Sequence, residues 1–216
     1  MLSLPMENTQ KVANTRSEHR ANTKTSRLEW LAEAKKLLIE GGIEQVKIDR
    51  IAKNLGVSRG GFYWFFKSRQ DILETLLADW LKIENDPLIN ALNGHNDTPL
   101  DPFFRFFTRL LRERTYSPKL DTAMREWARQ NKAAADAVTH VDNRRIEALK
   151  QAFLGLNYQP ADAFIRARIL YYHQIGYYAM NVIETEAQRQ QYLPTYFKQL
   201  TGFDLPNEIL DELYKK

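Results

Sequence analysis

Apolar residues recur every three or four positions along most of the chain after residue 25, which is the spacing of one face of an α-helix. No segment shows the sustained apolar–polar alternation or the Asn-Gly turn that would indicate strands. We therefore predict an all-α fold with about nine helices. The expected helices span residues 26–41, 48–55, 59–66, 68–83, 102–114, 118–130, 134–154, 160–183 and 186–200.

Helix boundaries are marked by residues that satisfy free backbone groups or interrupt the helix. Gly41-Gly42 is expected to end the first helix because glycine tolerates the left-handed position after a helix. Pro194 is expected to kink the last one. A capping box or a cap residue followed by proline opens a helix. Such start signals are Ser26 with Glu29, Ser68 with Asp71, Thr185 with Gln188, Asp101-Pro102 and Ser117-Pro118.

Residues 48–66 predict two short helices joined by a tight turn, which is the helix-turn-helix pattern. In that motif the first helix supports the second across the major groove of DNA. Gly56 removes the Cβ that would block a sharp turn, Val57 fills the angle between the helices, and Ser58 is expected to cap the second helix. Core positions are expected at Ile51, Ala52, Leu55, Phe62, Phe65 and Phe66. The outward face of the second helix offers Ser58, Arg59, Tyr63, Trp64 and Lys67.

This segment resembles the DNA-binding region of the TetR (tetracycline-repressor) family of transcriptional regulators. The resemblance covers about residues 26–86. It rests on Gly42-Ile43, on Ile51-Ala52-Lys53-Asn54-Leu55-Gly56-Val57-Ser58-Arg59-Gly60-Gly61-Phe62-Tyr63-Trp64-Phe65-Phe66-Lys67-Ser68, and on Asp71-Ile72-Leu73.

By position, the resemblance implies phosphate contacts for Tyr63 and Lys67 and a groove-facing second helix. Arg59 is the only long cation inside that helix, and a guanidinium can bond O6 and N7 of guanine together. Members of the family often have a hydroxyl residue where Lys47 stands, so the first helix of the motif loses a good cap, and Lys47 is expected to contact phosphate as a point charge. The full expected DNA-binding set is Lys24, Arg27, Lys47, Ser58, Arg59, Gly60, Tyr63, Trp64 and Lys67.

Two adjacent glycines, Gly60 and Gly61, lie inside the expected recognition helix, which spans about residues 58–66. Each glycine costs roughly 1 kcal/mol of helix stability relative to alanine. We therefore hypothesise that this helix is loose in the free protein and becomes ordered on DNA.

Charge is distributed unevenly along the 216 residues. Residues 1–71 carry a net charge of +5 and residues 72–216 a net charge of −1. A positive excess confined to the first third favours a polyanionic partner for that part of the chain, although a solvated basic surface gives the same count. Residues 1–24 are polar and mildly basic and predict a flexible N-terminal arm.

The residue inventory argues against several classes of protein. There is no cysteine, which excludes disulfides and thiolate chemistry. No catalytic motif, phosphate-binding loop or metal-ligand spacing is present, so we expect no enzyme activity, no cofactor and no metal. No apolar run is long enough to span a membrane and no signal peptide is evident, so we expect a cytoplasmic protein.

Residues 87–216 are expected to form a helical effector-binding and dimerisation domain behind a DNA-binding domain at residues 25–86. Their many aromatic residues indicate either a large helical core or a pocket for a flat, apolar molecule. The resemblance implies such a pocket, and a dimer interface built from the helices at about 160–183 and 186–200. The candidate pocket residues are Phe104, Phe107, Trp127, His140 and Tyr172.

The function expected from this sequence is a ligand-responsive repressor that binds a palindromic operator in double-stranded DNA as a homodimer. A small hydrophobic or aromatic effector would release it. The sequence is also compatible with an activator rather than a repressor. Two further alternatives are a helical small-molecule-binding protein or enzyme that has lost sequence-specific DNA binding, and a nucleoid protein that binds DNA without sequence preference.

Overall fold

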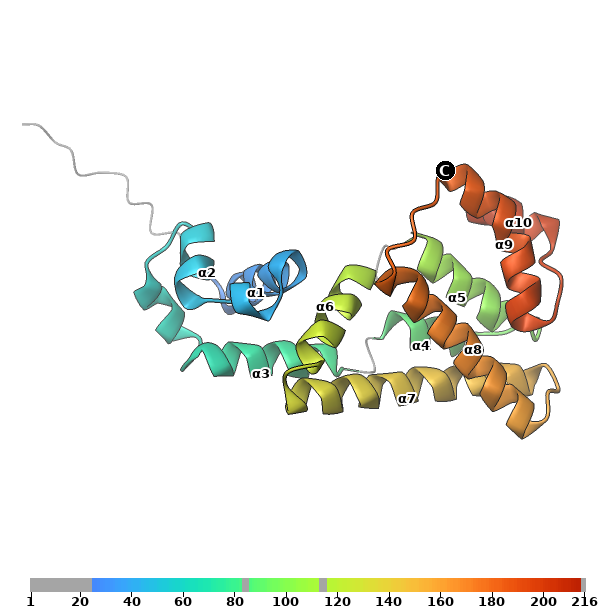
Figure 1. Cartoon of the computed structure of the whole chain (residues 1–216), viewed down its shortest axis with the longest axis horizontal. Coiled ribbons are helices and arrows are strands. Elements are labelled where there is room, and N and C mark those ends of the chain that lie inside the picture. The colour runs from blue at the N-terminus through green and yellow to red at the C-terminus, as the bar shows by residue number, and fades with distance from the viewer. Residues whose placement is uncertain (1–24, 83–85, 113–115, 215–216) are drawn as a thin grey trace, which may run out of the picture.

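The computed structural model describes residues 25–82, 86–112 and 116–214, and confirms the all-α fold over those ranges, within which no strand occurs. The expected arm at residues 1–24, including Lys24, lies outside them. Helices α1, α2 and α3 lie at one end of the molecule, and α7 runs from there to the other end (Figure 1). The helices are α1 (Arg27–Gly41), the 3-10 helix η1 (Ile43–Gln45), α2 (Ile48–Asn54), the 3-10 helix η2 (Arg59–Trp64), α3 (Arg69–Trp80), α4 (Pro87–Leu92), α5 (Asp101–Arg112), α6 (Pro118–Ala128), α7 (Lys132–Gly155), α8 (Pro160–Ala179), α9 (Glu186–Thr201) and α10 (Asn207–Tyr214).

The sequence prediction missed two α-helices, α4 and α10, and the short 3-10 helix η1. Helix α4 begins with an Asp86-Pro87 pair, and the Asp86 carboxylate accepts hydrogen bonds from the backbone N–H groups of Leu88 (2.9 Å) and Ile89 (3.1 Å). The same cap-plus-proline signal was recognised elsewhere in the chain, so this helix was predictable. Helix α8 ends at Ala179, four residues before its expected end at residue 183.

Most of the expected caps are present. Both reciprocal hydrogen bonds of the capping box form at Ser26 and at Thr185, and Ser117 caps α6. At α3 the Ser68 hydroxyl accepts a hydrogen bond from the backbone N–H of Asp71, as in a capping box. The Asp71 carboxylate, however, accepts a hydrogen bond from the backbone N–H of Lys67, one residue before the cap. Asp101 was predicted to be the cap that precedes Pro102, but it is already the first residue of α5.

The turn between α2 and η2 depends on a left-handed glycine. Gly56 has φ +68, whereas the space that a Cβ would occupy there has no neighbour within 4 Å. The glycine is therefore required by its backbone angle, and the expected steric block by a Cβ is wrong. Gly42, which ends α1, also has a positive φ of 76 but an extended ψ of −177.

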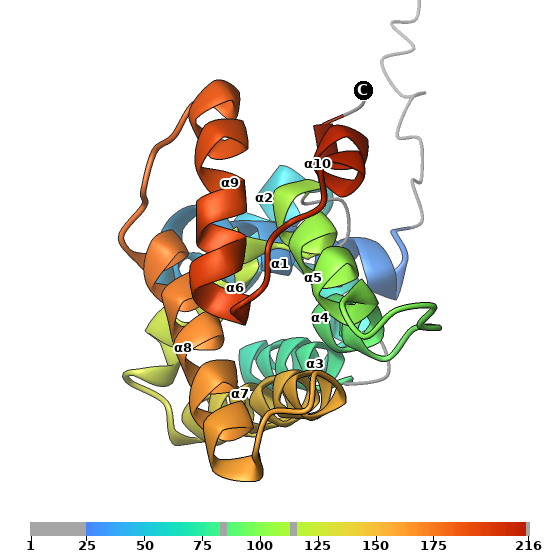
Figure 2. The same cartoon turned by 90° about the vertical axis from the view of Figure 1, so that its right-hand side faces the viewer.

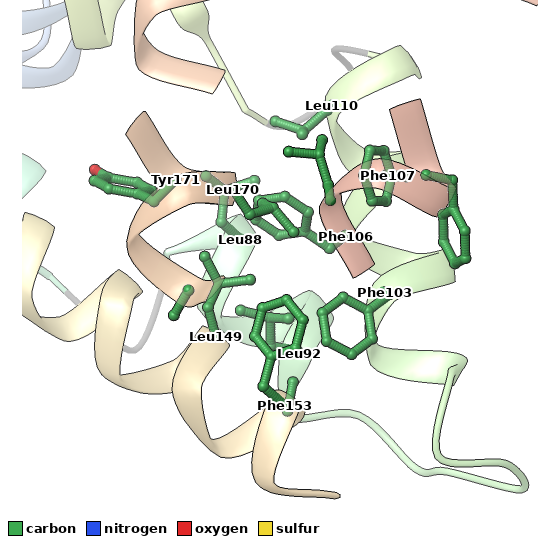
Figure 3. Packing of buried hydrophobic residues seen from close by; sticks show 14 of the residues in the cluster. Leu88, Leu92, Phe103, Phe106, Phe107, Leu110, Leu149, Phe153, Leu170 and Tyr171 are labelled. Carbon is green, nitrogen blue, oxygen red and sulfur yellow. The ribbon is translucent and has the colours of Figure 1, made fainter. Parts of the chain in front are cut away.

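Buried apolar side chains form two clusters. One lies among α4, α5, α7, α8 and α9 and contains Phe103, Phe106, Phe153 and Leu170 (Figure 3). The other surrounds Trp30 and Phe62 in the N-terminal helices. Side chains of α6 and of the first half of α7 also belong to the second cluster, so these helices pack directly against the N-terminal bundle. They are Ala123, Met124, Trp127, Ala134, Ala137 and Val138.

Candidate nucleic-acid interface and adjoining cavity

The helix-turn-helix forms around buried aromatic side chains. Phe62 is fully buried, with its ring centroid 5.4 Å from that of Trp30 in an edge-to-face arrangement. Phe62 and Phe66 stack at 5.4 Å, and Phe65 is partly buried against the same cluster. The expected core positions of these three phenylalanines are therefore confirmed, and they fix which face of η2 points outward.

The second helix of the motif is a 3-10 helix over Arg59–Trp64, not the α-helix expected to continue to Phe66. The Ser58 side chain makes no capping hydrogen bond, so its expected role as a cap is wrong. A 3-10 helix has poorer hydrogen-bond geometry than an α-helix and is normally short. Two consecutive glycines inside a six-residue helix supply little that would favour the α-helical form.

Exposed side chains on and beside η2 include most of the expected DNA-binding set. Trp64 is 86% exposed and Tyr63 is 52% exposed, although both are large and apolar in part. Neighbouring exposed side chains of this kind are more typical of a binding surface than of a surface that contacts only water. The remaining exposed members near the motif are Lys47, Ser58, Arg59, Gly60 and Lys67.

Arg59 is held between the two helices of the motif. Its guanidinium donates a hydrogen bond to the Tyr63 hydroxyl (3.3 Å) and lies 3.4 Å from the carboxylate of Asp49 on α2. The hydrogen bond to Tyr63 and the charge of Asp49 raise the pKa of Arg59 above its usual value. Sequence reasoning missed Asp49, because only the folded chain brings residues 49 and 59 together.

Two other residues at this end have positions that the sequence did not predict. Arg27, placed in the expected DNA-binding set, donates to the Thr75 hydroxyl (3.1 Å) and lies 4.8 Å above the ring of Phe66, so it helps to pack α1 against α3. Arg69 donates to the backbone carbonyls of Val46 (2.6 Å) and Ile43 (2.7 Å). Arg69 thereby fixes the segment that leads into Lys47, which begins α2 without a side-chain capping bond, as expected.

A cavity of about 710 Å³ lies between the N-terminal helices and the rest of the molecule. The C-terminal end of α1, from Leu38 to Gly42, forms one wall. The other walls come from α5, α6, α8 with the segment that follows it, and α9. Figure 2 shows α8 and α9 together on one side of the molecule and α4 and α5 on the other. The volume is within the range of small-molecule sites, which is roughly 300–1,000 Å³.

Of the five residues predicted to line a pocket, only Phe107 lines this cavity. Phe104 stacks on Phe197 with ring centroids 5.6 Å apart, and Trp127 is buried against the N-terminal bundle. His140 and Tyr172 are exposed on α7 and α8. The sequence identified aromatic helices correctly but did not show which face of each helix points toward which neighbour.

The cavity contains a cluster of polar aromatic side chains that sequence reasoning missed. Tyr177 donates a hydrogen bond to the Glu184 carboxylate (2.8 Å); burial, and then that bond, raise the pKa of Tyr177 to about 12. The His173 ring lies 5.1 Å from the ring of Tyr196. Burial lowers the pKa of His173. Together with Tyr177 and Tyr196, the ring forms part of an aromatic wall of the cavity.

A buried network of charged side chains joins α4, α6 and α7. Arg145, 4% exposed on α7, donates to Asp86 at the start of α4 (2.8 Å) and to Asp121 on α6 (2.7 Å). Burial opposes the charge of Arg145, but the surrounding acidic groups, Asp121 foremost, outweigh it and raise its pKa. Arg125 on α6 connects Asp121 (2.9 Å) to Asp142 on α7 (2.6 Å). The network therefore ties α4, α6 and α7 into one unit.

Neither a metal nor a membrane is indicated by the part of the chain that the structure describes. Within residues 25–82, 86–112 and 116–214, no group of three or more His, Asp or Glu side chains is arranged to hold a metal ion. Nor does any helix in those ranges have the length and apolarity needed to span a bilayer.

Comparison with known proteins explains the N-terminal motif. Residues 31–76 match the family model described as "Bacterial regulatory proteins, tetR family". The match assigns residues 31–76 to the TetR family. The matched segment contains α2, η2 and most of α1 and α3, so it includes Arg59, Tyr63 and Lys67.

One curated relative of this chain is the uncharacterized HTH-type transcriptional regulator TtgW of Pseudomonas putida. The two are 31% identical over 58 residues, which is 27% of this chain and 43% of TtgW. The match thus spans less than half of the length of that relative.

Solved structures share the fold over nearly the whole chain at low identity. A TetR transcriptional regulator from Legionella pneumophila is 14% identical, with 90% of this chain and 100% of that chain covered and a TM-score of 0.60. SmeT, the repressor of the Stenotrophomonas maltophilia multidrug efflux pump SmeDEF, is 17% identical, with 86% and 93% covered and a TM-score of 0.59. Reduced NemR from E. coli is 17% identical, with 87% and 95% covered and a TM-score of 0.56.

Helix α8 exposes a row of apolar side chains. Ile165, Ile169 and Tyr172 are 48%, 55% and 49% exposed and are spaced four and three residues apart, which places them on one face of the helix. Phe164 is 41% exposed beside them. Arg168 lies over the rings of both Phe164 (5.5 Å) and Tyr172 (5.3 Å).

Proposed function

We propose that this chain is a transcriptional repressor that binds a palindromic operator as a homodimer and releases it when a small aromatic effector enters the cavity. The observation that carries the proposal is the exposed surface of η2, where Arg59, Tyr63 and Trp64 project from a segment that matches the TetR family. SmeT, which shares the fold, is itself described as a repressor.

In the proposed complex, η2 enters the major groove and Arg59 reads a base edge. The contact of Arg59 with Tyr63 supports this role because it limits the freedom of a long side chain that would otherwise lose more entropy on binding. Lys47, Tyr63 and Lys67 contact phosphates, and Ser58, Gly60 and Trp64 face the groove.

The exposed row on α8 supports dimerisation through α8 and α9. Large apolar side chains that stay about half exposed in one protomer gain stability when a second copy covers them. A two-fold dimer presents its recognition helices about 34–36 Å apart, one turn of DNA. A single short helix makes few base contacts, so pairing two of them supplies most of the discrimination between sequences.

The position of the cavity supports release by an effector. A molecule bound there contacts α1, which belongs to the DNA-binding helices, together with α6 and α8. A small shift of α1 against α6 therefore changes the placement of η2 relative to its partner copy. The effector can act only if it binds the released arrangement more tightly than the DNA-bound one.

An electrophoretic mobility shift experiment on the DNA upstream of the protein's own gene tests this proposal. We expect a discrete complex that survives competitor DNA at about 0.2 M salt. Lys67→Ala should weaken the complex, whereas the matched control Lys132→Ala, an exposed cation on α7, should not. Binding only at low salt with no preferred fragment would indicate a protein that binds DNA without sequence preference. The absence of any complex would indicate a helical small-molecule-binding protein.

A further inference from the structure

We propose that the ligand of the cavity is an aromatic carboxylate, whose carboxylate binds Arg189 and whose ring lies against His173, Tyr177 and Tyr196. This inference rests on the proposed function only in treating the cavity as an effector site. The class of ligand follows from the side chains that line it.

Aromatic groups from two helices define the apolar part of the site. The ring of His173 on α8 lies 5.1 Å from that of Tyr196 on α9 and 6.4 Å from that of Tyr177 one turn further along α8. Phe107 adds a further ring from α5. Rings that meet from three helices favour a flat guest, because offset and edge-to-face contacts add to the area that a planar molecule buries.

The charges that line the cavity fall into two groups. Glu40, Lys119 and Glu126 are exposed, so water and salt screen their effect on a bound molecule. Glu184 and Arg189 are half-buried. The preference of the site for a ligand charge is therefore decided mainly by Glu184 and Arg189.

Glu184 and Arg189 differ in whether another side chain of the fold already binds them. The Glu184 carboxylate accepts a hydrogen bond from the Tyr177 hydroxyl (2.8 Å). The Arg189 guanidinium makes no hydrogen bond or ion pair with the residues that the structure describes, so its donors are available to a ligand. A guanidinium matches a carboxylate with two parallel hydrogen bonds, and such charge-assisted bonds are stronger than neutral ones.

Matched ligands on one naphthalene frame test this assignment with the full-length protein. The probes are 2-naphthoate, 2-naphthalenemethanol and 2-naphthylmethylamine, with decanoate as an aliphatic carboxylate. Isothermal titration calorimetry gives the Kd of each. We expect naphthoate to bind most tightly, and Arg189→Gln to weaken it by about tenfold to a hundredfold while leaving the alcohol nearly unchanged.

Glu184→Gln is the reciprocal variant, because it removes the negative charge that opposes an anionic ligand and keeps the shape of the side chain. It should strengthen naphthoate binding. Tighter binding of the amine or the alcohol, or naphthoate binding that survives Arg189→Gln, would overturn the assignment of a carboxylate. Tighter binding of decanoate would overturn the aromatic part, and no binding of any probe would overturn the whole inference.

The mobility shift experiment separates this inference from the proposed function. If the protein forms its operator complex but does not bind naphthoate, the proposed DNA binding stands and the ligand assignment is wrong. A protein that binds naphthoate through Arg189 but forms no DNA complex keeps the ligand site and loses the regulatory function.

Discussion

The guanidinium of Arg59 donates a hydrogen bond to the hydroxyl of Tyr63, four residues further along η2, at 3.3 Å. Arg59, which we propose reads a base, is thus hydrogen-bonded to Tyr63, which we propose contacts a phosphate. Asp49 completes the arrangement from α2, 3.4 Å from the same guanidinium. These are exposed contacts that add little to stability. Their consequence is that they set where the guanidinium of Arg59 lies when η2 is formed.

Replacing the two cations of this surface should have different effects on DNA binding. Arg59→Ala should cost about 1–3 kcal/mol on the operator and much less on unrelated DNA, because a base contact is lost. Lys67→Ala should weaken all sequences alike and reduce the salt slope by about 1, because a phosphate contact is lost. Fluorescence anisotropy titrations on both DNAs over a range of salt measure these effects. If both variants keep full operator affinity, the proposed DNA-binding face is misassigned.

The glycine pair of η2 should make this helix easier to open than its neighbours. Amide hydrogen exchange of residues 59–66 should be fast in the free protein and slow on DNA. A Cβ at Gly60 would lie 3.7 Å from the Ser58 hydroxyl oxygen, and one at Gly61 would lie 3.6 Å from Trp30, both ordinary contacts. The double substitution to alanine should therefore slow exchange in the free protein by favouring the helix. Equal protection of these amides in the free and bound protein would contradict the hypothesis.

A charge on the exposed row of α8 should prevent dimerisation. Ile169→Glu places a carboxylate where we propose that a second copy packs, and burying an unpaired charge costs several kcal/mol. Size-exclusion chromatography with light scattering should show a dimer for the unmodified protein and a monomer for this variant. Leu28→Glu is the control, because Leu28 is 74% exposed on α1 and distant in sequence from the proposed interface. A variant at Ile169 that stays dimeric would place the interface elsewhere.

The buried charged network should contribute strongly to stability. Asp121→Ala removes a carboxylate that binds both Arg125 and Arg145, and it leaves Arg145 buried with one fewer acidic partner. Breaking a buried pair in this way costs about 3–5 kcal/mol in the free energy of unfolding. Asp136→Ala, which removes an exposed partner of Lys132, should cost less than about 1 kcal/mol. Urea denaturation followed by circular dichroism measures both, and similar losses for the two variants would refute a special role of the network.

The helix-turn-helix could be predicted from sequence because its determinants are local. Gly56, Val57 and the spacing of Phe62 and Phe66 occur within about a dozen residues, so the order of the chain reveals their arrangement. The same applies to the capping box at Ser26.

The cavity could not be predicted in this way because its walls come from helices far apart in the chain. Trp127 illustrates the difficulty. It lies on the amphipathic helix α6, which turns it toward the N-terminal bundle and away from the cavity. No sequence pattern identified Arg189 or Glu184 as cavity residues, because their roles depend on Tyr177 and on the position of α9 against α8.

Selection of binding sites from a pool of random DNA duplexes tests most directly whether this chain reads a palindrome with two copies of η2. We predict that the retained duplexes share an inverted repeat whose half-sites are centred about 10 base pairs apart, or a multiple of that spacing. The same selection with Arg59→Ala should retain a less uniform set. A pool that stays random, or a single asymmetric site bound by one protomer, would contradict the account.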